Sequence, residues 1–171
     1  VLSPSDCVMA ARFAEIAYRL CGPSYVRLDR ELLPIIYSED DDFSLGLTNL
    51  KKGKDVCIIS TGNMVHIALE VSNKLAEYSI DAAVIDLYRL KPVNEKLLLG
   101  NIRNSKSIVT LEEHLISGGL GSIVAEVLID NNNKITPFKR FGIADKYYYA
   151  YGGRKNIQSL CGIDTNSCLL Y

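Results

Sequence analysis

Short apolar runs alternate with helical patterns through most of the chain. Four of these runs are bounded by turn residues and have the length and composition of strands buried on both faces: 55–60, 82–87, 107–111 and 138–143. The helix after the first run is expected to begin with Asn63 as its cap. Its predicted apolar face consists of Met64, Ala68, Val71, Leu75 and Tyr78. Because strands that alternate with helices are typical of an α/β domain, we expect a three-layer α/β/α fold around a mostly parallel, mixed sheet of about five strands.

The N-terminal region follows a different pattern. Apolar residues at helical spacing predict a helix over residues 3–20, with Ser3 or Ser5 as a cap of its first turn. A brief alternation of apolar and polar residues over residues 25–28 predicts a short strand. Such a strand would deliver charged residues to its C-terminal end, which is where α/β sheets bind their ligands.

Two charged stretches separate this region from the regular pattern. The sequences SEDDD (38–42) and KKGK (51–54) are typical of solvated surface segments, so we expect a connection between two domains here. Residues 1–50 are then the end of one α/β domain with a linker, and residues 51–171 are a complete second domain.

Composition narrows the range of partners and compartments. The 19 basic and 20 acidic side chains nearly cancel, and no apolar run approaches the roughly 20 residues of a membrane span, so we expect neither nucleic acid nor a membrane as a partner. The five cysteines form no CxxC pair, which indicates reduced thiols in the cytoplasm and no metal site. The chain starts at Val1 without a basic stretch before an apolar one, and we interpret this start as an interior cut rather than a signal peptide.

Two arginines stand on either side of Asp29, at the end of the short strand predicted in the N-terminal region. A guanidinium at Arg27 or Arg30 could form a forked contact with a phosphate or carboxylate of a ligand. A structural salt bridge with Asp29 or Glu31 fits the same spacing equally well.

The pair Glu112 and Glu113 precedes His114 at the end of a predicted strand. The histidine could be a general base that one of the glutamates orients, or it could be packed at a domain or subunit contact. We favour packing, since the chain has only one other histidine, His66, and no catalytic triad or metal cluster can be assembled from the sequence.

Two further motifs have both a functional and a structural interpretation. The turn Gly118-Gly119-Leu120-Gly121 could hold an anion at a helix N-terminus, but it lacks the spacing of a nucleotide-binding motif, and we favour tight turning and close helix packing. A tyrosine cluster could stack on bases, but without basic neighbours an aromatic domain contact is the better interpretation. It consists of Tyr147, Tyr148, Tyr149 and Tyr151.

Five stretches, in order, resemble the C-terminal section of the transketolase family. GPSYVRLDRE (22–31) resembles the end of its pyrimidine-binding domain. Four later stretches are similar to its C-terminal domain: GKDVCIISTGNMVHIALE, IDLYRLKPVNEKLL, TLEEHLISGGLGSIVAEVL and GIADKYYYAYGG. The resemblance is most specific at EEHLISGGLGSIVAEVL (112–128), which looks like the short or split-subunit transketolases. Residues 1–50 and 51–171 would then be the end of the pyrimidine-binding domain with its linker and the transketolase-type C-terminal domain.

The resemblance implies a transferase that moves a two-carbon ketol unit from a ketose phosphate to an aldose phosphate. It implies thiamine diphosphate and Mg²⁺ or Ca²⁺ as cofactors at a homodimer interface, held by segments upstream of this region. This portion alone is therefore expected to bind no cofactor and to be inactive without the rest of the enzyme or an N-terminal subunit. Arg30 matches the family arginine that contacts the sugar phosphate, and Asp6 matches a residue that we interpret as a helix cap.

One departure from the family pattern and two alternatives remain. Many relatives have Gly-Glu-Ser-Gly after the last strand, whereas this chain has YYAYGGRK (148–155), so the local domain contact is expected to differ. The resemblance also fits 1-deoxyxylulose-5-phosphate synthase or the β subunit of a 2-oxo-acid dehydrogenase. An alternative of another class is a non-catalytic regulatory domain that binds a nucleotide or other anion at the GGLG turn.

Overall fold

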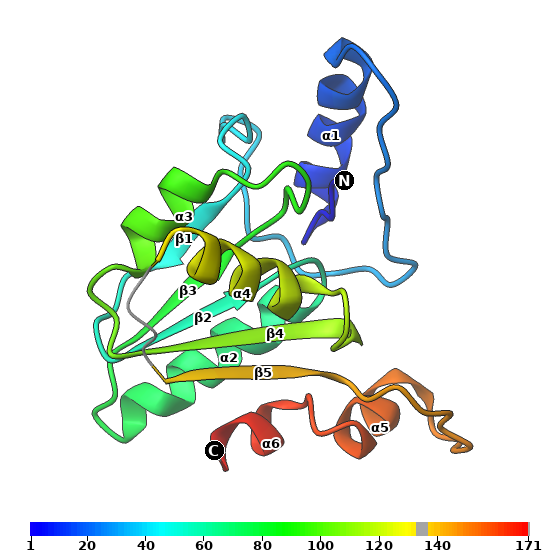
Figure 1. Ribbon diagram of the computed structural model, residues 1–171. Coiled ribbons are helices and arrows are strands. Elements are labelled where there is room, and N and C mark those ends of the chain that lie inside the picture. The colour runs from blue at the N-terminus through cyan, green and yellow to red at the C-terminus, as the bar shows by residue number, and fades with distance from the viewer. Residues whose placement is uncertain (133–136, 171) are drawn as a thin grey trace.

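The computed structural model describes residues 1–132 and 137–170, and a five-stranded mixed sheet forms its centre (Figure 1). The strands are β1 (Thr48–Lys51), β2 (Val56–Ser60), β3 (Ala82–Asp86), β4 (Ser107–Leu115) and β5 (Phe138–Ile143). They lie side by side in the order β1-β3-β2-β4-β5. The strands β2 to β5 are parallel, and only the edge strand β1 runs antiparallel to its neighbour.

Helices cover both faces of the sheet, as Figure 1 shows. The helices after β1 are α2 (Met64–Glu77), α3 (Glu95–Ile102), α4 (Leu120–Asp130), α5 (Gly153–Leu160) and α6 (Thr165–Leu169). One hydrophobic core joins α3 and α4 to the sheet, and a second core on the opposite face joins α2 and the C-terminal segment to it. Alternate strand residues supply the two cores, since Ile59 belongs to the first and its neighbour Ile58 to the second. The expected three-layer α/β/α arrangement is confirmed.

Several details differ from the expectation. The sequence pattern does not reveal β1, because its residues TNLK are mostly polar and only half-buried at the sheet edge. This strand also spans the expected boundary between residues 50 and 51, and the division of the chain into two domains stays a proposal. The Asn63 side chain does not cap α2 but donates to Glu113, and Tyr78 is 72% exposed rather than part of the apolar face of α2.

The N-terminal region includes α1 (Cys7–Arg19), which packs on Tyr88, just after the C-terminal end of β3. Asp6 is the N-cap residue, as the resemblance implies, and neither Ser3 nor Ser5 has this role. One Asp6 carboxylate oxygen accepts the Met9 amide at 2.8 Å, while the other accepts two backbone amides of the segment that follows the helix, those of Ile36 and Tyr37. The Asp6 carboxylate therefore fixes both the start of α1 and the position of the segment that contains Ile36 and Tyr37.

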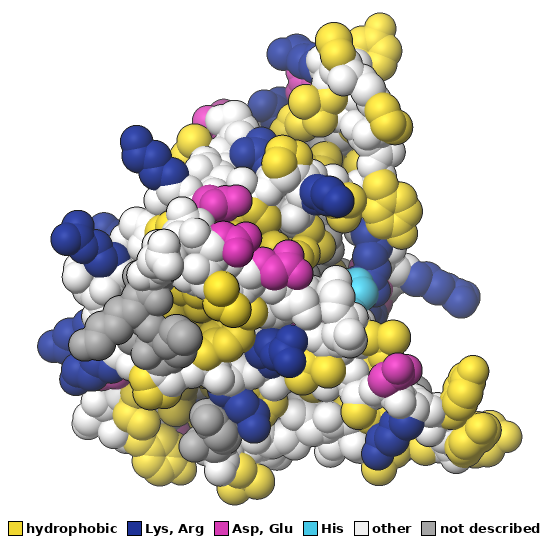
Figure 2. Space-filling model, viewed as in Figure 1, with side chains coloured by type: hydrophobic (Ala, Val, Ile, Leu, Met, Phe, Trp, Pro, Cys, Tyr) yellow, Lys and Arg dark blue, Asp and Glu magenta, His cyan; other side chains and the backbone are white. Residues whose placement is uncertain are grey.

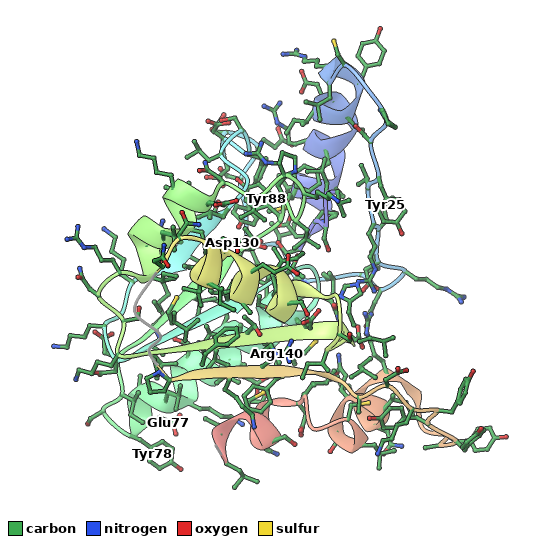
Figure 3. All side chains as sticks on the ribbon, viewed as in Figure 1. Tyr25, Glu77, Tyr78, Tyr88, Asp130 and Arg140 are labelled. Carbon is green, nitrogen blue, oxygen red and sulfur yellow. The ribbon has the colours of Figure 1, made fainter. Side chains whose placement is uncertain are left out.

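The strand expected over residues 25–28 is absent. Val26 forms an isolated parallel bridge with Leu2, which also forms an antiparallel bridge with Arg89. An aromatic cluster holds the region in place instead. Phe13, Phe43 and Tyr88 pack with ring centroids 5.7 to 6.0 Å apart. Tyr88, fully buried, lies between the sheet and α1 (Figure 3).

Asp86, at the C-terminal end of β3, joins the N-terminal region to the sheet. Its Oδ2 atom accepts hydrogen bonds from Ser5 Oγ at 2.5 Å and from the Tyr37 hydroxyl at 3.0 Å. Burial raises the pKa of Asp86 to about 7, although the hydrogen bonds from Ser5 and Tyr37 act in the opposite direction. At mildly acidic pH the folded protein therefore holds a proton on Asp86 that the unfolded chain has already released.

We predict that Asp86→Asn raises the free energy of unfolding at pH 8. In the native protein, stability falls as the pH rises from about 4 to 7, by on the order of 2 to 4 kcal/mol, because only the folded state keeps the carboxyl protonated in this range. Asparagine has the shape of the neutral acid and removes this loss. Urea denaturation at pH 5 and pH 8 checks the result, with Asp130→Asn on the surface of α4 as the control. Equal pH dependence in native protein and Asp86→Asn would contradict it.

Candidate functional site

The candidate site lies where the parallel strands end and the N-terminal region crosses them. At this edge Asn63 follows β2, Asp86 ends β3, and Glu113 and His114 lie near the end of β4. The strand β4 is longer than the sequence predicts, so the Glu112–His114 triplet lies inside it and not just after its end. The carboxyl ends of parallel strands are where α/β proteins gather functional side chains.

An arginine that the sequence analysis did not single out is at the centre of this edge. Arg154, in the first turn of α5, donates to both carboxylate oxygens of Asp29, at 2.8 and 2.5 Å. The same guanidinium donates to Glu31 at 3.0 Å and to both oxygens of Glu113. The expected salt bridge at Asp29 thus exists, but its cation is Arg154 and not Arg27 or Arg30.

The pKa values in this network follow from the ion pairs. Hydrogen bonding from Arg154 lowers the pKa of Asp29 to about 2, against the effect of partial burial and with help from the Glu31 amide. The Asp29 and Glu113 carboxylates raise the pKa of Arg154. These ion pairs hold the N-terminal region against β4 and α5. The stretch YYAYGGRK (148–155), where the domain contact was expected to differ from that of relatives, therefore forms ion pairs through Arg154.

Arg27 and His114 form a second contact across the same boundary. The Arg27 guanidinium donates to Nδ1 of His114 at 3.1 Å, so the ring is neutral with its proton on Nε2. Burial first, and then the charge of Arg27, lower the pKa of His114. The His114 side chain on β4 therefore contacts the N-terminal region through Arg27, while the Glu112 carboxylate lies 3.9 Å from its Nδ1 atom, beyond hydrogen-bond distance.

Glu112 binds backbone amides at the start of α4 and does not orient His114 as a general base. Its fully buried carboxylate accepts the amides of Leu120 at 2.7 Å and Gly121 at 2.8 Å, at the N-terminus of α4. Burial raises the pKa of this carboxyl, whereas the two amides act in the opposite direction. A Cβ atom at Gly119 would overlap the Glu112 carboxylate. The glycine turn thus serves close packing, and the protein's own carboxylate takes the place of an external anion.

Arg30 is exposed and lies in a separate hollow of about 240 Å³. Segment 28–33 and the start of α1 line this hollow, with Cys7 and Ala10 on the helix side. Among residues 1–132 and 137–170, no carboxylate forms an ion pair with Arg30. The positive end of the α1 dipole borders the same hollow. The hollow is also lined by Asp6, whose carboxylate accepts backbone amides, and by Asp29 and Glu31, whose carboxylates pair with Arg154.

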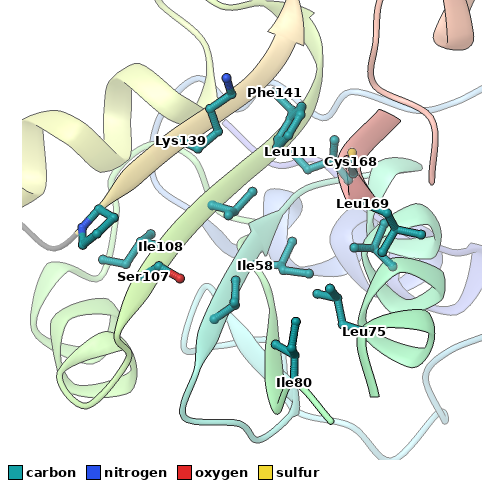
Figure 4. Close-up of a pocket in the computed structure, with 14 residues that line it drawn as sticks. Ile58, Leu75, Ile80, Ser107, Ile108, Leu111, Lys139, Phe141, Cys168 and Leu169 are labelled. Atoms are coloured by element: carbon teal, nitrogen blue, oxygen red, sulfur yellow. The ribbon is translucent and has the colours of Figure 1, made fainter. Parts of the chain in front are cut away.

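Two other surfaces do not form a reaction site. A hollow of about 270 Å³ between α2 and β5 has a mostly aliphatic lining (Figure 4), and burial raises the pKa of its Cys168 thiol to about 12, so this cysteine is no nucleophile. Tyr147, Tyr149 and Tyr151 are at least 86% exposed and make no domain contact within the described chain. Nor do the described residues include a cluster of three or more potential metal-ligating His, Cys, Asp or Glu side chains.

Comparison with known proteins gives the family. The sequence model for the transketolase C-terminal domain matches residues 47–168. One subunit of the apulose-4-phosphate transketolase from Actinobacillus succinogenes is 36% identical over 166 residues, which are 96% of this chain and 52% of that protein. The 1-deoxy-D-xylulose-5-phosphate synthase of Halothermothrix orenii is 35% identical over 134 residues, 76% of this chain and 21% of the synthase.

Solved structures agree with this assignment. A split-gene transketolase, in the form of an inactive beta4 tetramer, superposes with a TM-score of 0.90 at 34% identity. The match covers 99% of this chain and 55% of the split-gene chain. The Campylobacter jejuni transketolase shares the fold, with a TM-score of 0.73 at 18% identity over 98% of this chain and 25% of its own.

The chain therefore belongs to the transketolase family, whose C-terminal domain it contains. Its relatives are transferases of the transketolase type, and the family in general depends on thiamine diphosphate. The chain spans about half the length of the first of these relatives. No helix in the described part of the chain has the length and apolar character needed to cross a membrane.

We predict that Glu112→Ala lowers the free energy of unfolding by about 1 to 3 kcal/mol, because two buried amides of α4 lose their acceptor. Glu126→Ala, at an exposed position of the same helix, is the matched control and is expected to change it by less than about 0.5 kcal/mol. Chemical denaturation measures both. Equal effects of the two substitutions would show that the Glu112 carboxylate does not stabilise the helix start.

Proposed function

We propose that this chain is the C-terminal portion of a thiamine-diphosphate-dependent transketolase that transfers a two-carbon ketol unit between sugar phosphates. The similarity to one subunit of apulose-4-phosphate transketolase over 96% of the chain supports this proposal. So does the 34% identity to a split-gene transketolase structure over nearly the whole chain. The remaining part of the enzyme would be a second subunit or another region of the same polypeptide.

Within this enzyme, Arg30 would bind the phosphate group of the sugar. The observation that supports this role is an exposed arginine without an ion-pair partner in the described chain, beside the N-terminal end of α1. Guanidinium groups and helix N-termini both favour phosphate oxygens. The ion pairs of Arg154 attach the neighbouring residues, Asp29 and Glu31, to β4 and α5, so the loop that carries Arg30 is held in place.

The described residues do not fit a site for thiamine diphosphate and its metal ion. They contain no cluster of metal ligands, and Glu112 already occupies the first amides of α4. Both cofactors, thiamine diphosphate and Mg²⁺ or Ca²⁺, would therefore be held by the rest of the enzyme. This chain alone would be inactive and would contribute substrate binding and packing.

Exposed apolar side chains support an association with the rest of the enzyme and a homodimer. Leu28, Leu32 and Ile35 are between 64% and 97% exposed on the N-terminal region. Figure 2 shows hydrophobic side chains projecting on this region at the upper right and on the segment after β5 at the lower right. Burial of such surface would stabilise subunit and domain contacts.

Among the alternatives, 1-deoxyxylulose-5-phosphate synthase has support from the 35% identity to such an enzyme over 76% of this chain. The two functions differ in their donor substrate. A ketose phosphate that donates a ketol unit supports transketolase, whereas consumption of pyruvate would support the synthase. The regulatory anion-binding domain has less support, because Glu112 and Ser122 already accept amides of the GGLG turn.

We predict that Arg30→Ala in the complete enzyme raises KM for a phosphorylated sugar by about 10- to 100-fold, since a charge-assisted contact is lost. The affinity for thiamine diphosphate should not change. Steady-state kinetics and a cofactor titration check the two parts. Arg103→Ala, an exposed arginine near the opposite end of β4, is the control. An unchanged KM in Arg30→Ala would overturn the proposed role of this residue.

A further inference from the structure

We propose that Arg154 is a positioning residue for substrate binding: it pairs with the carboxylates on both sides of Arg30 and so leaves the Arg30 guanidinium available to the sugar phosphate. This inference rests on the proposed role of Arg30. It concerns an arginine that is 125 residues away from Asp29 in sequence and belongs to α5. Arg154 itself need not contact the substrate.

The geometry places a single guanidinium among three carboxylates. Arg154 forms ion pairs with Asp29 at 2.5 Å and Glu31 at 3.0 Å, and with Glu113 on β4. Glu113 is in turn fixed by hydrogen bonds from Asn63 at 2.7 Å and Gln158 at 3.2 Å. The cation is therefore anchored to the sheet, and it draws the two acidic neighbours of Arg30 toward this anchor.

Without Arg154, those neighbours would compete with the substrate. Consecutive Cα atoms are only about 3.8 Å apart, so the Asp29 and Glu31 carboxylates are within reach of the long Arg30 side chain. At such separations, below a Debye length of about 8 Å, they could pair with Arg30 or repel a bound phosphate. The very low pKa of Asp29 agrees with a carboxylate whose charge is already compensated.

Arg27 is not available for the same role. Its guanidinium donates to His114 at 3.1 Å and forms no ion pair with Asp29 or Glu31 within the described chain. Arg154 is also only partly exposed, at 29%, so its contacts are less screened than those of a surface lysine. Among the residues that the structure describes, the ion pairs of Asp29 and Glu31 therefore both go to Arg154.

The test uses the complete enzyme and two ketol donors, one with a phosphate group and one without. Arg154→Ala is expected to raise KM for the phosphorylated donor by about tenfold, and to leave kcat and the KM of the other donor nearly unchanged. Arg154→Gln, which keeps hydrogen bonding without the charge, should behave similarly. Lys155→Ala removes an adjacent exposed charge and is the matched control.

Rescue distinguishes charge compensation from a purely structural contact. Adding Asp29→Asn and Glu31→Gln to Arg154→Ala removes the uncompensated carboxylates, so KM for the phosphorylated donor should return toward the native value. Calorimetric titration of each variant with a sugar phosphate gives the same comparison without turnover. Equal losses for both donors, or no rescue, would overturn the inference.

Arg30→Ala, measured in parallel, separates the two proposals. If it weakens only the phosphorylated donor while Arg154→Ala has no such effect, the role of Arg30 stands and that of Arg154 is wrong. If Arg30→Ala does not discriminate between the donors, the proposed role of Arg30 fails, and the positioning role fails with it.

Discussion

The pairing of charged groups at the end of β4 connects most of the parts of this molecule. Three consecutive residues each bind a different element: Glu112 accepts amides of α4, Glu113 pairs with Arg154 of α5, and His114 receives Arg27 from the N-terminal region. Glu112 is fully buried, so leaving its carboxylate without a partner would cost several kcal/mol, whereas the Glu113 side chain is 15% exposed. The end of one strand therefore determines where two helices and the N-terminal region lie.

The sequence pattern predicted the layers of the fold and most of its strands. The run at 138–143 coincides with β5, and the other three predicted runs overlap β2, β3 and β4, because strands buried on both faces are continuously apolar. The edge strand β1 has no such signal, since its residues are only half-buried. The predicted strand ended at residue 111, and the extension of β4 through Glu112 to Leu115 was missed because its charged residues break the apolar pattern of a buried strand.

The candidate site was less accessible to sequence reasoning. Arg30 was predicted from a family resemblance. Its position beside the start of α1 agrees with an anion site, but this position results from tertiary contacts that residue spacing does not predict. The partner of Asp29 is 125 residues away in the chain, so neither periodicity nor a local motif could identify Arg154. The sequence did indicate this region, because the stretch YYAYGGRK, which contains Arg154, departs from the family pattern.

The distance in sequence between Asp29 and Arg154 also has a consequence for how the molecule forms. Contacts between remote segments require the closure of a long loop, and they form after local helices and neighbouring strand pairs. The ion pairs that hold Asp29 and Glu31 against β4 and α5 can form only once α5 has folded. During synthesis on the ribosome, the ion pairs that flank Arg30 would thus be missing until α5 has emerged.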